Sequence, residues 1–163
     1  MANSFHRTAP GISVLDYLNR LARHATLTPP LLLSMVYYID RLCALYPGFT
    51  INTLTVHRFL ITAATVASKG LSDAFWNNST YARVGGVRVA ELKLLELEFL
   101  YRVDWRIVPK PDVLVAYYEG LVDRHPGFCF DPDDPTPAPA PVPVTASAFS
   151  SAVVAASRSD STP

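Results

Sequence analysis

The stretch NTLTVHRFLITAATVASKGLSD, residues 52–73, decides the fold of this chain. Its apolar residues cover most of the circumference of a helix instead of forming one stripe: Val56, Phe59, Leu60, Ile61, Ala63, Ala64, Val66 and Ala67. A helix that is apolar nearly all round is surrounded by other elements. Its alanines also let neighbouring helices approach closely. The pattern therefore predicts a buried central helix, capped by Asn52 or Thr53 and ending near Gly70.

A single cation, Lys69, closes this apolar run. Lysine is almost never fully buried without a partner. Either Lys69 emerges at the surface where the helix ends, or a carboxylate or a main-chain carbonyl group pairs with it. The choice between these alternatives bears directly on the function.

The chain has 163 residues, half of them hydrophobic, which is enough for one domain with a hydrophobic core. Residues 1–125 hold 13 lysines and arginines against 10 acidic residues, and residues 126–163 hold 1 against 4. This small basic surplus does not suggest nucleic-acid binding, which usually needs a concentrated basic face.

The cysteines and the hydropathy pattern bear on the compartment. Cys43 and Cys129 are the two cysteines and lie far apart, so we expect a reducing environment and no disulfide framework. The longest apolar run, Phe59 to Ser68, is about half the roughly 20 residues that cross a bilayer. The first residues lack the pattern of a secretory signal. We expect an intracellular protein, in the cytoplasm, the nucleus or both, without contact to a membrane.

Four further long helices are expected around the central one. Ser13 is a candidate N-cap, and Thr28-Pro29-Pro30 is typical of a helix start. Asn77 and Asn78 predict a short helical turn through Ala82 within a structured connection. The expected long helices cover residues 13–24, 29–45, 89–103 and 112–123.

The composition changes at Pro126, because residues 126–163 hold 8 of the 14 prolines and few large apolar residues. Such a segment buries too little surface to offset its ordering entropy. The sequence therefore predicts an all-α fold in three parts. A flexible N-terminus (1–11) precedes a single five-helix domain (12–125) with its third helix central, and a disordered tail rich in proline, alanine and serine (126–163) follows.

The sequence holds no catalytic constellation. Its four histidines are scattered, and none lies at metal-ligand spacing with cysteines or carboxylates. Gly85-Gly86 lacks the spacing and the flanking strand of a phosphate-binding loop. No serine or cysteine lies in a nucleophile motif. We expect no metal, no cofactor, no small-molecule substrate and no enzymatic activity.

The residues that stand out are charges within apolar helices: Asp40, Arg41, Lys69 and Glu96. One interpretation is that they form ion pairs inside a helical bundle, which says little about function. The other joins Lys69 to Glu96 on one side of the bundle. There a lysine can donate to a partner's main-chain carbonyl groups, and a glutamate can accept from the free amides of a partner helix.

Several segments, taken in order, resemble the cyclin box: Tyr38-Ile39-Asp40-Arg41, Val66-Ala67-Ser68-Lys69 and Leu95-Glu96-Leu97-Glu98-Phe99-Leu100. Others are similar to the PHO80-like, or P/U-type, cyclins: residues 52–62, Asn77-Asn78 with Tyr81-Ala82, Val84-Gly85-Gly86-Val87 and Ala90-Glu91-Leu92. The resemblance covers roughly residues 5–124. It implies a five-helix cyclin-box domain that binds and activates a cyclin-dependent kinase as a heterodimer, in cell-cycle or phosphate-signalling regulation.

The resemblance also implies roles for single residues. Lys69 and Glu96 match the cyclin residues that hydrogen-bond the kinase backbone, and Phe99 and Leu100 match the apolar ridge against its regulatory helix. Asp40 and Arg41 match a structural charged pair. Gly70 and Arg88 depart from the family, and we expect a looser end of the central helix and a weakly capped helix after Arg88. The alternative is a cyclin-fold helical module that binds nucleic acid or a protein other than a kinase.

Overall fold

The computed structural model describes residues 11–129, and this part of the chain is all helical, as predicted. Its six helices are α1 (Val14–His24), α2 (Pro29–Leu45), α3 (Val56–Leu71), α4 (Asn78–Gly85), α5 (Val89–Arg102) and α6 (Pro111–Asp123). The N-terminal residues 1–10 and residues 130–163 of the expected tail lie outside the described part.

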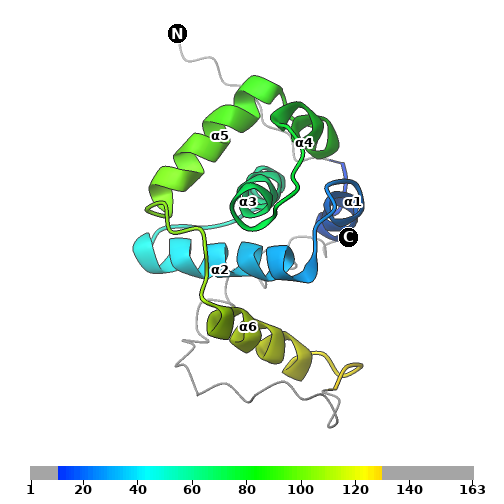
Figure 1. The fold of residues 1–163 in the computed structure, drawn as a ribbon, viewed down its shortest axis with the longest axis vertical. Coiled ribbons are helices and arrows are strands. Elements are labelled where there is room, and N and C mark those ends of the chain that lie inside the picture. Colours follow the sequence, from blue (N-terminus) through cyan, green and yellow to red (C-terminus); the bar gives the residue numbers. More distant parts are fainter. Residues whose placement is uncertain (1–10, 130–163) are drawn as a thin grey trace, which may run out of the picture.

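Helix α3 is the core of the molecule, as its sequence predicts. It packs against α1, α2, α4 and α5, which surround it in Figure 1, where α3 is seen nearly end-on. Every residue from Leu60 to Ser68 is buried. Ala63, Ala64 and Ala67 are completely buried, so small side chains face the neighbouring helices at several points of the circumference.

The short helix α4 has a larger role than the sequence suggests. We expect only a helical turn at Asn77 to Ala82, but the segment forms eight residues of helix that pack against α3. A Cβ atom added to Gly85 would lie 2.4 Å from Ile61 Cγ1, so this glycine permits the close approach of α4 to α3. Gly86 ends α4 with a φ of 68°, which favours glycine.

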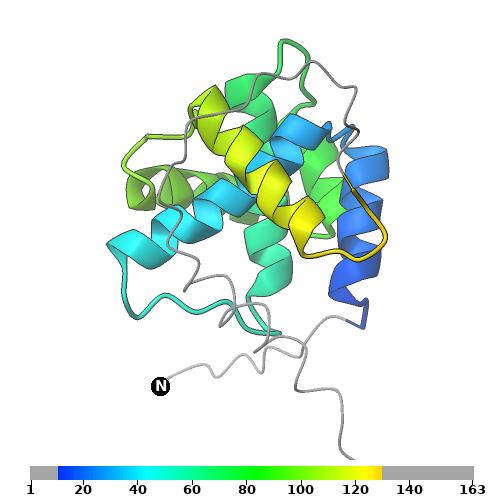
Figure 2. The same ribbon diagram turned by 90° about the horizontal axis from the view of Figure 1, so that it is seen from below.

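Helix α6 is not one of the helices around α3. It packs against α2, on the outside of the bundle, which Figures 1 and 2 show from two directions. The sequence predicts the helix at 112–123 as one of the four around the central helix, and this placement is wrong. The short α4 takes that position against α3, and α6 packs outside on α2.

The helix starts follow the sequence in part. The side chains of Ser13 and Asn77 accept hydrogen bonds from the main-chain amides of Asp16 and Thr80. Arg88 makes no side-chain cap for α5, as expected. The predicted cap of α3 is wrong: the helix begins after Thr55, because Asn52 accepts from the amide of Leu54 in a preceding turn.

Candidate functional site

Lys69 and Glu96 lie on the same side of the bundle and bind each other. Lys69, in the last turn of α3, donates from Nζ to Glu96 Oε1 at 2.7 Å and to Oε2 at 2.9 Å. The side chains are 28% and 15% exposed, so the pair reaches the surface without being fully solvated. Lys69 therefore has a carboxylate partner and is also accessible, which combines both alternatives left open by the sequence.

A third side chain, Asn78, completes this cluster, and sequence reasoning missed it. Its Nδ2 donates to Glu96 Oε2 at 3.0 Å from the first turn of α4. The preceding residue, Asn77, already caps the helix. A helix start needs only one asparagine as its cap. The second asparagine in the sequence was therefore the available signal that Asn78 has another role.

Gly70 lies beside the cluster and does not loosen the end of α3, contrary to expectation. The helix continues through it to Leu71. A Cβ atom at position 70 would lie 2.6 Å from Ile107 Cδ1. The glycine therefore makes room for Ile107, which follows α5 and packs against the core.

The two apolar candidates on α5 lie at different depths. Phe99 is 6% exposed and belongs to the core, where its ring contacts those of Tyr38 and Phe59. Leu100 is half-buried and packs against the core from outside. The large apolar side chains that face solvent on α5 and just after it include Leu94, Leu97, Tyr101 and Trp105.

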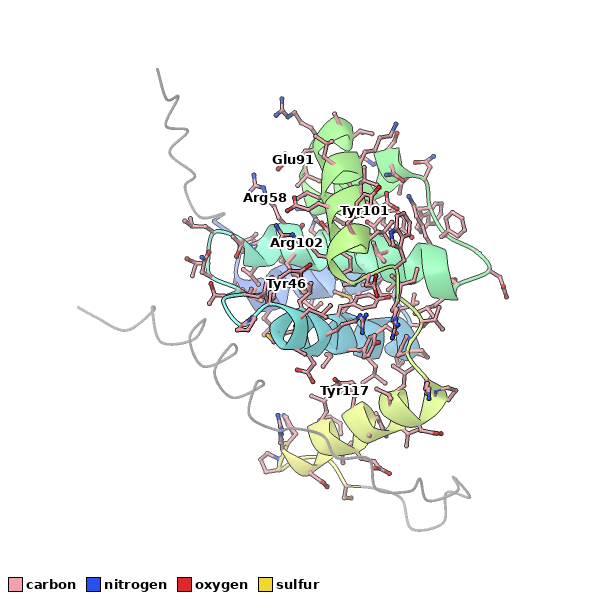
Figure 3. The ribbon with its side chains drawn as sticks, turned by 90° about the vertical axis from the view of Figure 1, so that its left-hand side faces the viewer. Tyr46, Arg58, Glu91, Tyr101, Arg102 and Tyr117 are labelled. Carbon is pink, nitrogen blue, oxygen red and sulfur yellow. The ribbon has the colours of Figure 1, made fainter. Side chains whose placement is uncertain are left out.

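Asp40 and Arg41 point to different partners. Arg41 Nε donates to the main-chain oxygen of Val103 at 2.8 Å, just after α5. Asp40 Oδ2 accepts from the hydroxyl of Tyr117 on α6 at 2.5 Å, and Figure 3 shows Tyr117 between α6 and α2. No ion pair joins Asp40 to Arg41 in the part that the structure describes. Both residues connect α2 to other elements, so their geometry is that of scaffolding.

The environment of Asp40 is unusual, because its second oxygen, Oδ1, is buried without a hydrogen-bond partner in the described part. Burial raises the pKa of Tyr117 well above its usual range, and the hydrogen bond to Asp40 adds to this effect. The phenol therefore stays protonated as a donor to the carboxylate.

A second face of α5 carries a hollow of about 750 Å³, between the end of α2, the start of α3 and α5. Arg58, which lines it, donates to Glu91 at 2.7 Å, and Arg102 pairs with Glu98, one helical turn earlier on α5, at 2.7 Å. Figure 3 shows these arginines on the side that also carries Tyr46 and Tyr101. Each of the two arginines is thus paired with a carboxylate.

Residues 11–129 contain neither a metal-site cluster nor a helix that could span a membrane. No three histidine, cysteine, aspartate or glutamate side chains lie together as a metal site would require. None of the helices has the length and apolar character needed to cross a membrane.

A model of one protein family, described as Cyclin, matches residues 1–107 of this chain. The chain belongs to the cyclin family. This confirms the resemblance on which the cyclin-box interpretation rests.

Individual cyclin relatives agree with the PHO80-like resemblance. Nuc-1 negative regulatory protein preg of Neurospora crassa is 77% identical over 80% of this chain and 27% of that protein. PHO85 cyclin PHO80 of Saccharomyces cerevisiae is 52% identical over 62% of this chain and 34% of that protein. Cyclin-U1-1 of Arabidopsis thaliana is 40% identical over 70% of this chain and 55% of that protein. The cyclin chain described here thus spans between about a quarter and a half of these relatives.

Proposed function

We propose that this chain is a regulatory subunit that binds and activates a cyclin-dependent kinase of the PHO85 type, and that it acts in phosphate signalling. The observation that carries the proposal is the cluster of Lys69, Glu96 and Asn78, a cation and an anion held together at a surface. The name of the yeast relative, PHO85 cyclin PHO80, supports the choice of kinase.

The cluster has unused hydrogen-bonding capacity. An ammonium group has three donors, and Lys69 uses two of them on Glu96. Oε1 of Glu96 accepts from Lys69 alone and has a further lone pair, whereas Oε2 already accepts from both Lys69 and Asn78. Lys69 can therefore donate to a main-chain carbonyl of the kinase, and Glu96 can accept from an amide, without first breaking their own pair. Such a pre-formed arrangement lowers the entropy cost of binding.

Apolar side chains of α5 and of the segment just after it supply contact area. Leu97, Tyr101 and Trp105 are 48%, 65% and 56% exposed, and Leu100 is half-buried beside them. In the proposed complex Leu100 contacts the regulatory helix of the kinase. Phe99 supports this surface from the core, because its contacts with Tyr38 and Phe59 hold α5 against α2 and α3.

Activation follows by population shift. The cyclin binds the kinase conformer whose regulatory helix is rotated inward, so that its glutamate pairs with the lysine of the ATP site. Differential affinity for this conformer is the entire source of the activation. The cyclin itself contributes no catalytic group.

The proposal is tested with a purified PHO85-type kinase and a Lys69→Ala, Glu96→Ala double variant. We expect the variant to fold and to bind the kinase at least about tenfold more weakly, since buried charge-assisted contacts are worth 2 kcal/mol or more. A matched control is Glu98→Ala, Arg102→Ala, which removes an exposed pair from the same helix. We expect this control to bind normally.

Two results would contradict different parts of the proposal. A folded double variant that binds and activates the kinase normally would reject the assignment of Lys69 and Glu96. A wild-type chain that neither binds nor activates the kinase would reject the function itself.

A further inference from the structure

A second hollow lies on the opposite side of α4 from Asn78, between α1 and α4. Its volume is about 530 Å³, and it is lined by Arg20, His24, Trp76, Thr80, Arg83 and Val84. It shares no residue with the Lys69 cluster.

The two arginines of this hollow have no acidic partner. Within residues 11–129, no carboxylate lies within 4.0 Å of Arg20 or Arg83, whereas the two arginines that line the first hollow, Arg58 and Arg102, are both paired. Arg20 Nη2 lies 3.4 Å from the main-chain oxygen of Arg83, a long contact that holds the guanidinium of Arg20 over α4. The remaining donors of both guanidinium groups are available to a ligand.

The hollow also has an apolar wall. It is formed by Trp76 and Val84, and the indole of Trp76 is fixed because its Nε1 donates to Thr26 Oγ1 at 3.2 Å. Thr80 adds a hydroxyl group, which can donate to an anion. Two guanidinium groups, a hydroxyl donor and an apolar surface thus meet in one place.

We propose that this hollow binds a phosphorylated serine or threonine side chain of a peptide segment. Guanidinium groups present a fork of donors that matches a phosphate group, and two of them offset its charge of about −1.5 to −2 at pH 7. The apolar wall of Trp76 and Val84 contacts the carbon atoms of the bound segment. The site is independent of kinase docking, because it lies on the other side of α4.

A peptide fits better than the other carriers of phosphate. The hollow is much larger than a phosphate ion and has apolar walls that such an ion does not contact. A nucleic acid needs cations along its backbone, whereas this hollow is lined by two arginines, Arg20 and Arg83.

The experiment uses titration calorimetry with the complete chain and a five-residue peptide, a phosphoserine between two alanines on each side. The emission of Trp76 gives a second signal when Trp105 is replaced by phenylalanine. We expect binding that weakens as salt increases, and a loss of at least about tenfold in the Arg20→Ala, Arg83→Ala variant. The matched control is Arg23→Ala, an exposed arginine of α1 that does not line the hollow, and it should bind within about twofold of the wild type.

The unphosphorylated peptide and inorganic phosphate complete the comparison. If they bind as tightly as the phosphopeptide, the hollow does not recognise a phosphorylated side chain and the proposal is wrong. The same holds if Arg23→Ala weakens binding as much as the double variant does. Should the double variant fail to fold, the Arg20→Ala and Arg83→Ala single variants must each weaken binding for the proposal to stand.

Discussion

The hydroxyl of Tyr17 on α1 donates to the main-chain oxygen of Gly85 on α4 at 2.8 Å, inside the bundle. The Tyr17 ring also meets His57 of α3 edge-on, with the ring centroids 4.8 Å apart. Burial raises the pKa of Tyr17 to about 12, although Arg20 and Arg58 act to lower it. Three helices thus meet at a phenol that must remain protonated.

We predict that alkaline pH destabilises the protein through this phenol. Its pKa is near 10 in the unfolded chain and about 12 in the folded one, so the folded state binds the proton more tightly. The contribution of Tyr17 to stability is complete below pH 10 and is lost as the pH rises through 12, by about 1.4 kcal/mol per pH unit. Burial also raises the pKa of Tyr38 and Tyr117, which gives the same sign. Urea denaturation at a series of pH values, with tyrosinate absorbance, measures the effect.

Tyr17→Phe is the control for this prediction. It should cost about 1 kcal/mol at neutral pH, because Gly85 loses its hydrogen-bond donor. Its stability should then fall less steeply than that of the wild type between pH 10 and 12. Equal slopes for the two proteins would show that Tyr17 does not titrate with folding.

We predict that Gly85→Ala destabilises the bundle by about 1–3 kcal/mol, as overpacking of a core does. The added Cβ atom would meet Ile61 at 2.4 Å, and Ile61 is completely buried on α3. Thermal unfolding followed by circular dichroism measures the change.

Gly120→Ala is the matched control, because nothing lies within 4 Å of a Cβ atom at that position of α6. It should stabilise the protein by up to about 1 kcal/mol, since alanine favours a helix. Adding Ile61→Ala should relieve the clash, so that the double variant is more stable than the two single effects predict by addition. Additive effects would argue against a clash between these residues.

The sequence predicts what depends on local pattern. The all-round apolar character of residues 56–67 is enough to identify a buried helix, and Lys69 at its end is enough to require either the surface or a partner. The start of α3 was misplaced because Asn52 has the same preference for a turn as for a helix cap, and here it caps the turn before Thr55.

What the sequence does not predict depends on contacts between distant segments. Periodicity identifies the apolar face of α6 but not the helix that this face meets, so the bond from Tyr117 to Asp40 could not be foreseen. The same holds for Arg41 and the carbonyl of Val103, because any main-chain oxygen can be the acceptor. From the sequence alone Gly70 indicates a weak helix end, because the position of Ile107 beside it is set by the packing of the chain after α5.

We predict that Tyr117→Phe destabilises the protein by about 2 kcal/mol, the range for a hydrogen bond to a charged group. The variant leaves Asp40 with no hydrogen bond from the described residues, since its Oδ1 already has none. Chemical denaturation measures the loss. Tyr101→Phe is the control, because its side chain is 65% exposed on α5 and it should change little.

A second variant separates the lost hydrogen bond from a general effect on α6. Replacing both partners, with Asp40→Leu and Tyr117→Phe, removes the unpaired carboxylate and should recover part of the stability. A double variant that is less stable than Tyr117→Phe alone would mean that Asp40 has another role in holding α2.

Finally, we predict that Asn78→Ala weakens kinase binding by about fivefold without unfolding the chain. Asn78 donates to Glu96 Oε2 at 3.0 Å, so its removal lets the Glu96 side chain leave the orientation that suits an incoming amide. One hydrogen bond of this kind is worth about 1 kcal/mol, which corresponds to the fivefold change. Ser79→Ala is the matched control, since Ser79 is an exposed neighbour on the same helix and should bind normally. Surface plasmon resonance with the purified kinase should find the difference mainly in the dissociation rate. If Asn78→Ala binds like the wild type while the Lys69, Glu96 double variant does not, Asn78 supports α4 and has no part in orienting Glu96.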